Sequence, residues 1–271
     1  MIVLHENEYM MANLISSFPS LNVDIKDINP LALMTFYSEL SYKEVTLIHN
    51  MSKRAFTVVI EGNLGSGKST FLKQFNEKTD NVDVIPEPVD RWQNIGGNNL
   101  LAMMYEDPTR YSFVFQMYAQ LTMLERHTEP CDKLAKIMER SLARYCFIEN
   151  LYTTGKISNV EHTVLSEWFD YLTSNPKFDT QVDVVVYLRT SPEVAYKRIL
   201  ARGRKEEANI PYDYIKHLHE LYEQWLFTKT KFQTPSKIIV IDADKNLDSL
   251  QTTYKENKIK ILDMAKKERI V

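Results

Sequence analysis

Five short apolar runs recur along the chain, and stretches with a helical pattern of apolar residues separate them. The runs are Thr57–Glu61, Val82–Ile85, Lys136–Glu139, Val182–Leu188 and Lys237–Ile241. Their apolar positions are nearly continuous rather than alternating, which is typical of parallel strands that are buried on both faces. The alternation of strands and helices predicts a doubly wound α/β sheet, in which ligands bind beyond the carboxyl ends of the strands. We therefore expect the polar residues that end these runs to form the functional site.

Three of the seven glycines in the chain lie within six residues, directly after the first run. The segment GNLGSGKS matches the G-x-x-x-x-G-K-S pattern of a phosphate-binding loop. Glycine adopts positive φ angles, so the backbone N–H groups can turn inward around an anion at the start of the next helix. The alternative is an ordinary glycine-rich turn, which the strand before it and the helix after it disfavour. The pattern predicts a nucleoside triphosphate site formed by Gly62, Asn63, Leu64, Gly65, Ser66, Gly67, Lys68, Ser69 and Thr70.

Two residues of this loop have expected roles beyond the backbone. The Lys68 ammonium would reach the outer phosphates, and the Ser69 hydroxyl would bind Mg²⁺. The expected cofactor is therefore Mg²⁺, with ATP as the phosphate donor.

The composition is that of an ordinary globular protein, with 44% apolar and 25% charged residues. The 33 basic and 36 acidic residues give no general field that would attract a polyanion, so we expect no nucleic acid polymer as a partner. No run approaches the roughly 18 apolar residues that a bilayer span needs, so we expect no membrane partner. Cys131 and Cys146 are too few for a disulfide framework and indicate a reducing compartment, which we take to be the cytoplasm.

The first fifty residues differ from the rest of the chain. They contain no glycine or arginine, and they carry two lysines and six acidic residues. A mitochondrial presequence is rich in arginine and poor in acids, so this segment is a poor candidate for one, and a mitochondrial location remains the alternative. We expect residues 1–53 to be an N-terminal extension, either disordered or a mis-assigned leader. Residues 54–271 are expected to form a single domain, since no linker or repeat interrupts them.

Several segments of the chain resemble the deoxyribonucleoside kinase family, in the order in which that family has them. They lie between Phe56 and Leu262 and read VIPEPVDRW, GGNNLLAMMYEDPTRYSFVFQMYAQLTML, MERS, ARYCFIEN, LSEWFDYL, VVYLRTSPEVAYKRILARGRKEE, LHELYEQWL and VIDAD. They are most similar to the insect multisubstrate and mitochondrial-type thymidine kinase branches. The resemblance implies transfer of the γ-phosphate of ATP to the 5′-hydroxyl of deoxyribonucleosides (thymidine, deoxycytidine and purine nucleosides) in nucleotide salvage. It also implies a three-layer α/β/α fold with a five-stranded parallel sheet, and a homodimer.

Phosphoryl transfer to an alcohol needs charge neutralisation, alignment and a base at the attacking hydroxyl. Glu87 follows the second run by two residues and precedes a proline, so its carboxylate is placed to be that base. By resemblance, Arg140 holds the substrate hydroxyl and phosphate, and Glu139 supports Mg²⁺ together with Ser69. The alternatives are an exposed acid in a turn for Glu87 and a structural salt bridge for Glu139 and Arg140. We expect Glu87, Arg140 and Lys68 to be the catalytic residues.

A basic segment, RILARGRKEE, follows the fourth run and a helix start at TSPE. The i, i+4 spacing puts Arg198 and Arg202 on one helical face. Guanidinium groups suit bidentate binding of a triphosphate, although a charged stretch on a helix is more often a solvated surface. By resemblance, this segment is a mobile lid over ATP, with Arg198, Arg202 and Arg204 as its arginines.

Four further polar residues acquire roles through the resemblance alone. Glu207, at the end of the basic segment, resembles the carboxylate that holds the sugar 3′-hydroxyl together with Tyr105. Asp242 and Asp244 resemble the loop over the adenine of ATP.

The segment FVFQMYAQLTM predicts a base pocket around Gln116. Its amide offers both a donor and an acceptor, as the Watson–Crick edge of a pyrimidine requires, and an unsatisfied amide is costly in apolar surroundings. Met and aromatic residues at helical spacing are more often core than pocket. By resemblance, the apolar walls of the pocket are Trp92, Leu101, Met104, Phe115, Met123 and Phe147.

Ala119 departs from the family pattern and is also expected to line the base pocket. It lies one helical turn from Gln116, and pyrimidine-preferring relatives carry a bulkier valine there. The smaller side chain leaves space that a purine ring can fill. We expect easier acceptance of deoxyadenosine and deoxyguanosine than in a valine-bearing relative.

The segment MERSLARYCF is a second departure, since relatives have two more residues between the serine and ARYCF. A deletion inside a helix would rotate everything downstream by about 200°, and Ala143 and Phe147 would then point away from the base. A deletion in the loop before the helix would keep the register with a tighter turn. The role of Arg144, an active-site arginine in relatives, depends on the same choice.

Two other functions fit parts of the sequence. A nucleoside monophosphate kinase shares the phosphate loop and arginine lid, but it needs a further basic clamp for the acceptor phosphate. A catalytically silent nucleotide-binding homologue is compatible with the shortened MERSLARYCF segment. A GTPase is disfavoured, because no N-K-x-D motif is present.

Overall fold

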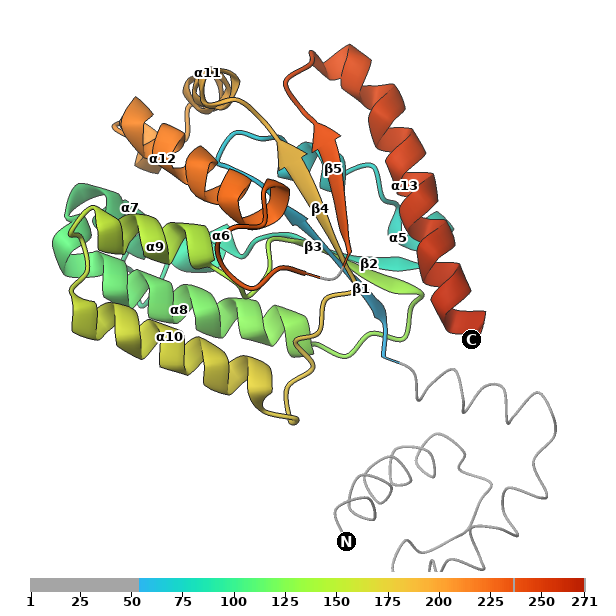
Figure 1. Ribbon diagram of the computed structural model, residues 1–271, viewed down its shortest axis with the longest axis horizontal. Helices are drawn as coiled ribbons and strands as arrows, with labels where there is room; N and C mark the ends of the chain where they lie inside the picture. Colours follow the sequence, from blue (N-terminus) through green and yellow to red (C-terminus); the bar gives the residue numbers. More distant parts are fainter. Residues whose placement is uncertain (1–53, 236, 271) are drawn as a thin grey trace, which may run out of the picture. The chain divides into compact units, whose positions relative to one another are not determined.

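The computed structural model describes residues 54–235 and 237–270, so the expected extension at residues 1–53 lies outside the described residues. Five parallel strands form one sheet in the order β2-β3-β1-β4-β5 (Figure 1). The strands are β1 (Phe56–Glu61), β2 (Val82–Ile85), β3 (Ala135–Glu139), β4 (Val184–Arg189) and β5 (Ile238–Asp242). Each expected run contains a strand, and the predicted α/β fold with a five-stranded parallel sheet is confirmed.

Helices connect these parallel strands. Those before β3 are α4 (Lys68–Leu72), α5 (Glu77–Asp80), α6 (Val89–Gln93), α7 (Leu100–Glu106) and α8 (Pro108–Thr128). After β3 come α9 (Tyr145–Thr153), α10 (Asn159–Ser174), α11 (Pro192–Arg202), the 3₁₀ turn η2 (Lys205–Glu207), α12 (Tyr212–Tyr222), the π-helical turn η3 (Glu223–Phe227) and α13 (Leu247–Ile270). Within the described residues, no helix is both long and apolar enough to cross a bilayer.

Helices cover both faces of the sheet because alternate side chains of the central strand point in opposite directions. Val59 belongs to an apolar cluster that includes residues of α6, α7, α8, α9 and α12. Val58 and Ile60 belong to a second cluster, with Phe71 of α4 and Tyr254 of α13. In Figure 1, α13 lies on one side of the strands and α8, α9 and α12 lie on the other. This three-layer arrangement explains why the central strands are apolar without interruption.

The fourth strand begins two residues later than its apolar run. The Thr57 N–H donates to the carboxylate of Asp183 at 2.7 Å, so a side chain takes the place of a strand carbonyl at that point. The regular ladder between β1 and β4 starts at the pair Val58 and Val184.

The shortened MERSLARYCF segment places its turn between a strand and a helix. β3 ends at Glu139 and α9 begins at Tyr145, so residues 140–144 form a loop. Arg140 takes a positive φ of 65° there, which makes the turn tight. The alternative of a deletion inside a helix is therefore wrong for this fold. Phe147 lies in the first turn of α9 and lines the cavity described below, whereas Ala143 lines a different hollow on this side of the sheet.

We predict that Gly65 tolerates no side chain. A Cβ there would lie 2.3 Å from the carbonyl oxygen of Ala195 in α11, at a φ of +72°. Gly155 is a matched control, because its φ is +66° and a Cβ there would meet nothing within 4 Å. Gly155→Ala should cost about 1 kcal/mol of unfolding free energy from the left-handed conformation, and Gly65→Ala about 2 kcal/mol more from overpacking. Urea unfolding of the two variants measures both costs, and equal costs would contradict the packing of α11 on this loop.

Candidate active site

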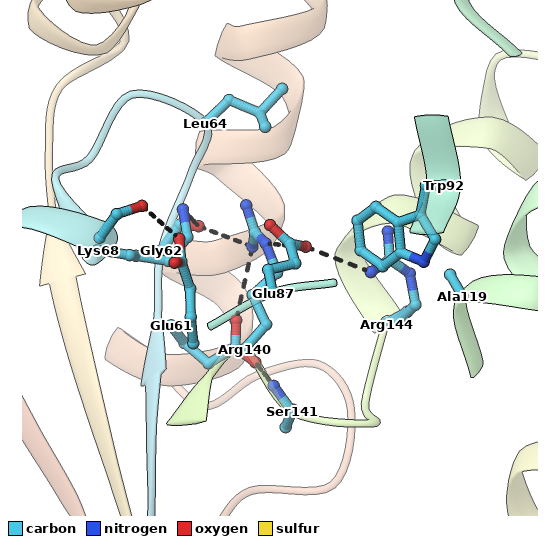
Figure 2. Close-up of polar contacts among 12 residues, drawn as sticks. Glu61, Gly62, Leu64, Lys68, Glu87, Trp92, Ala119, Arg140, Ser141 and Arg144 are labelled. Atoms are coloured by element: carbon cyan, nitrogen blue, oxygen red, sulfur yellow. Dashed lines mark hydrogen bonds and ion pairs between the residues drawn. The ribbon is translucent and has the colours of Figure 1, made fainter. Parts of the chain in front are cut away.

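The glycine-rich loop between β1 and α4 closes around the side chain of Lys68. Gly62, Gly65 and Gly67 have positive φ angles of 147°, 72° and 94°, which glycine adopts without a steric cost. The Lys68 ammonium donates to the carbonyl oxygens of Gly62 at 3.2 Å and Asn63 at 2.7 Å. Figure 2 shows Lys68 beside Gly62, on the same side of the site as Glu61. The loop thus has the backbone shape of a phosphate cradle, with its lysine held by neutral acceptors.

The surroundings of Lys68 disfavour its positive charge. Burial, and after it the positive charge of Arg140, lowers the pKa of Lys68 from 10.5 to about 7, although three nearby carboxylates partly oppose this. A bound anion would favour the charged form and raise this pKa. The three carboxylates therefore do not fully compensate the charge of Lys68, and a polyphosphate would complete the compensation.

Two oxygen donors meet beside the phosphate loop. The Ser69 hydroxyl, in the first turn of α4, donates to the Glu139 carboxylate at 2.9 Å. Glu139 ends β3, and the parallel register of β1 and β3 brings it level with the start of the loop. Hydroxyl and carboxylate oxygens are ligands that Mg²⁺ accepts, usually together with water and substrate phosphates. These two residues therefore fit a metal that enters with the nucleotide. The described residues contain no cluster of three or more His, Cys, Asp or Glu side chains suited to a metal.

Glu87 lies between two buried guanidinium groups. Its carboxylate is 3.0 Å from Arg140 Nε and 3.7 Å from Arg144 Nη1. The Glu87 side chain is 13% exposed, whereas those of the two arginines are 3% and 4% exposed. In Figure 2, Arg140 lies toward the phosphate loop and Arg144 toward Trp92, with Glu87 between them. The arrangement rules out an exposed turn acid for Glu87 and places a carboxylate midway between the loop and the cavity.

Glu61 and Tyr222 fix the other side of Arg140. Arg140 Nη1 donates to the Tyr222 hydroxyl at 2.6 Å and to the Gly62 carbonyl oxygen at 3.0 Å, and it lies 3.7 Å from the Glu61 carboxylate. Glu61 also accepts bonds from the N–H and hydroxyl of Ser141, at 2.9 and 2.8 Å. Burial opposes the charge of Arg140, but Tyr222 and the carboxylates around it raise its pKa above the ordinary value.

These two supporting residues were not predicted from the sequence. Glu61 ends the first run, so the rule that flagged the polar ends of the other strands also applied to it. Tyr222 carries no such signal, because it comes from α12, 161 residues further along the chain.

A cavity of about 30 Å³ lies beyond Glu87. Most of the predicted substrate residues line it, namely Glu87, Trp92, Leu101, Met104, Tyr105, Phe115, Gln116, Arg140, Phe147 and Glu207. Leu64 and Arg204 line it as well, together with Val89, Arg144, Leu151 and Tyr214, which were not among the predicted residues. The predicted pocket residues Ala119 and Met123 are buried in the adjoining core and do not line the cavity.

Two arginines of the predicted lid bind the Glu207 carboxylate and make no contact with the phosphate loop among the described hydrogen bonds. Arg204 donates to the Glu207 carboxylate at 2.8 Å, and Arg202 donates to its other oxygen. Arg198 instead donates to the carbonyl oxygens of Ala243 and Lys245, both at 2.9 Å. The structure therefore brings Arg204 to the cavity wall, Arg202 to Glu207 beside it, and Arg198 to the loop after β5. Binding of the triphosphate by these arginines remains a prediction.

Of the remaining predicted residues, Asp242 and Asp244 lie at the end of β5 and in the loop after it, and Tyr105 lies in the cavity wall. Asp244 accepts a bond from the N–H of Ser191 at 2.7 Å, and Asp242 accepts one from the N–H of Asp244 at 3.2 Å, so both shape the loop after β5. Tyr105 lines the cavity together with Glu207, and burial first, then Tyr214 and Glu207, raises its pKa well above 10. Its hydroxyl therefore stays protonated and available as a hydrogen-bond donor.

A carboxylate that lies between a phosphate loop and a small cavity is the arrangement of a P-loop kinase for a small acceptor molecule. Comparison with known proteins narrows this class. A family model described as deoxynucleoside kinase matches residues 58–266, and the chain belongs to that family. The predicted resemblance and the predicted kinase class are thereby confirmed.

Similar proteins with established names include two kinds of kinase. Human mitochondrial thymidine kinase 2 is 44% identical over 207 residues, which cover 76% of this chain and 77% of that protein. Rat deoxycytidine kinase is 36% identical over 218 residues, covering 70% and 84% of the two chains. Chicken deoxycytidine kinase 2 is 33% identical over 238 residues, covering 78% and 88%. Members of this family phosphorylate deoxynucleosides with ATP as the phosphate donor.

We predict that nucleotide binding at pH 8 takes up a proton at Lys68. In the free protein the pKa of about 7 leaves this side chain mostly neutral at pH 8, and the bound polyphosphate would restore its charge. At pH 6 the side chain is already charged and gains nothing, so ATP affinity should fall as the pH rises above 7. Titration calorimetry in buffers of different ionisation enthalpy measures the uptake, and a value near zero at pH 8 would contradict the assignment.

Proposed function

We propose that this deoxynucleoside kinase transfers the γ-phosphate of Mg²⁺-ATP to the 5′-hydroxyl of a deoxyribonucleoside, giving the 5′-monophosphate for nucleotide salvage. The observation that carries the proposal is the position of Glu87 between two buried arginines, with the phosphate loop on one side and a small cavity on the other. A sugar alcohol held at this carboxylate would face the outer phosphates of a nucleotide in the loop.

The residues around Glu87 suit the chemistry of such a transfer. The carboxylate can accept a hydrogen bond from the attacking hydroxyl and take its proton late in the reaction. Arg140 Nη2 is buried and makes no hydrogen bond within the described residues, so it remains available to oxygens that gain charge during the transfer. Lys68 would hold the outer phosphates once their charge restores its own.

We further propose that Ser69 and Glu139 hold Mg²⁺. Their hydrogen bond at 2.9 Å already places two oxygen ligands at the end of the phosphate loop. When bound, the metal would supply positive charge that offsets the negative charge of the phosphates. The serine would contact it directly, and Glu139 would do so through water.

The cavity also supports a nucleoside as the acceptor. Glu207 and Tyr105 lie together at its rim, where a sugar 3′-hydroxyl can exchange hydrogen bonds with both. Gln116 offers polar recognition among the apolar side chains of Trp92 and Phe115, as a heterocyclic base requires. The names of the relatives suggest thymidine and deoxycytidine as acceptors.

The other two functions have weaker support. The loop position of the shortened segment leaves Glu87 and Arg140 in contact, so the reason for a silent homologue is gone. A monophosphate kinase needs a free basic clamp for the acceptor phosphate, and the cationic side chains at the cavity are engaged with Glu87 and Glu207.

The expected homodimer finds support in one apolar surface. Helices α8 and α10 pack against each other. Of the ten large apolar side chains exposed in the described residues, six lie on these two helices: Val114, Leu121, Val160, Val164, Trp168 and Tyr171. Exposed apolar side chains gathered in this way mark an interaction surface. We propose that a second copy of the chain covers it.

For the compartment we propose the cytoplasm, with the mitochondrion as the alternative. Cys131 and Cys146 are both free, as in a reducing compartment. The human relative named above is mitochondrial by name.

We predict that Glu87→Gln lowers kcat for every accepted nucleoside by about 10²- to 10⁴-fold, because the amide cannot take the proton of the 5′-hydroxyl. Glu106→Gln is the matched control, since Glu106 is an exposed acid at the end of α7, and it should keep full activity. Product formation from Mg²⁺-ATP and each deoxynucleoside or deoxynucleotide measures both variants. Full turnover of Glu87→Gln, or phosphorylation of deoxynucleotides alone, would contradict the proposal.

We predict that Trp168→Asp converts the dimer to a monomer, because it puts a charge on the apolar surface of α8 and α10. Ile259→Asp is the control, since Ile259 is 60% exposed on α13, away from this surface. Sedimentation equilibrium measures the mass of each variant. A wild-type protein that is monomeric at micromolar concentration would refute the proposed dimer.

A further inference from the structure

Arg144 lies in the wall of the cavity, directly before α9. Its Nε donates to the side-chain oxygen of Gln116 at 2.8 Å. Its guanidinium carbon is 4.8, 5.3 and 5.8 Å from the ring centroids of Phe147, Trp92 and Phe115. The same three rings were predicted to stack on a base. A charged group therefore occupies part of the surface that a base would use.

The shortened loop and a small neighbour explain this position. Residues 140–144 run directly from β3 into α9, which carries Arg144 into the pocket wall. Ala119 is 0% exposed and has no side chain beyond Cβ. Figure 2 shows Ala119 and Trp92 on the same side of the site as Arg144.

The contact with Arg144 also decides how Gln116 can bind a ligand. A guanidinium has no acceptor, so the atom of Gln116 that meets Nε must be the amide oxygen. That contact uses one of the two lone pairs of the oxygen, and the NH₂ group of Gln116 keeps both of its donors for a base. Arg144 Nη1 lies 3.7 Å from Glu87 but makes no hydrogen bond within the described residues. The polar edge of the pocket therefore offers donors from two side chains, against the one lone pair that the Gln116 oxygen has left.

We propose that Arg144 is a specificity-determining residue, which makes the pocket select bases that present two neighbouring acceptors on one edge. Cytosine does so with O2 and N3, and guanine does so with O6 and N7. Thymine and adenine place a donor next to each acceptor on the edges that face such a pocket. This inference rests on the proposed function and deepens it, because it ranks the nucleosides that the kinase takes.

The test compares four deoxynucleosides in two ways, by kcat/KM with Mg²⁺-ATP and by the dissociation constant in titration calorimetry. In the wild-type protein, deoxycytidine or deoxyguanosine should exceed thymidine and deoxyadenosine by about 10- to 100-fold. A preference for deoxycytidine would show that the pocket fits a one-ring base, and a preference for deoxyguanosine would show that it fits a two-ring base. A wild-type preference for thymidine or deoxyadenosine would overturn the inference.

Variants of Arg144 separate its role from that of the rest of the pocket. Arg144→Met keeps the length of the side chain but removes every donor, and it frees Gln116 to present both donor and acceptor. The advantage of the preferred nucleoside over thymidine should then fall by about 10- to 100-fold, beyond any loss of turnover shared by all nucleosides because the contact with Glu87 is gone. Arg144→Lys keeps the charge and loses the paired donors, so it should give an intermediate loss. Arg110→Met, at an exposed arginine on α8, is the control and should leave the ranking unchanged.

Altered nucleosides test the same point in the unchanged protein, which matters if an Arg144 variant does not fold. 7-Deaza-2′-deoxyguanosine lacks N7, and 3-deaza-2′-deoxycytidine lacks N3. The analogue of the preferred nucleoside should bind at least about tenfold more weakly than its parent. Equal binding of parent and analogue, or an unchanged ranking in Arg144→Met, would overturn the inference. A binding preference without any turnover would instead contradict the proposed function and leave this inference standing.

Discussion

Arg140 organises the carboxyl ends of three neighbouring strands. Its side chain is 3% exposed, and a charge removed from water at that depth must be paired, because an unpaired one costs several kcal/mol. Glu61 of β1 lies on one side of it and Glu87, beyond β2, on the other, at 3.7 and 3.0 Å. Arg140 itself follows β3, so one guanidinium joins the ends of β1, β2 and β3. The contact that stabilises this edge of the sheet also aims the carboxylate of Glu87.

The charges of the site are arranged for a ligand that carries negative charge. Burial and Arg140 together lower the pKa of Lys68 to about 7, which means that the protein alone does not compensate this cation fully. Arg140 Nη2 is also buried without a hydrogen bond within the described residues. A polyphosphate would pair with Lys68 and accept a hydrogen bond from Arg140 Nη2. Because folding has already removed both groups from water, binding does not have to pay for their desolvation again.

A second set of ion pairs lies at the cavity. Glu207 pairs with both Arg202 and Arg204, and Glu207 and Arg204 line the cavity. Glu207 is paired with two arginines, so it keeps one partner if the other leaves. A ligand hydroxyl can then bind Glu207, and a ligand phosphate can bind the released arginine. In this structure both arginines are held at Glu207.

The sequence by itself determined the strands, the phosphate loop and the family, because each depends on residues close together in the chain. Gly62 to Ser69 form a contiguous motif, and Glu87 follows its strand by two residues, so local spacing was enough to single them out. Tyr222 and the contact of Arg144 with Gln116 lay beyond such reasoning, since they join segments that are far apart in the sequence. Only the tertiary structure decided that the shortened segment is a loop, that Ala119 and Met123 lie behind the cavity wall, and that Arg144 fills part of it. Those outcomes depend on how helices pack across the sheet, and no short stretch of sequence carries the distances between packed elements.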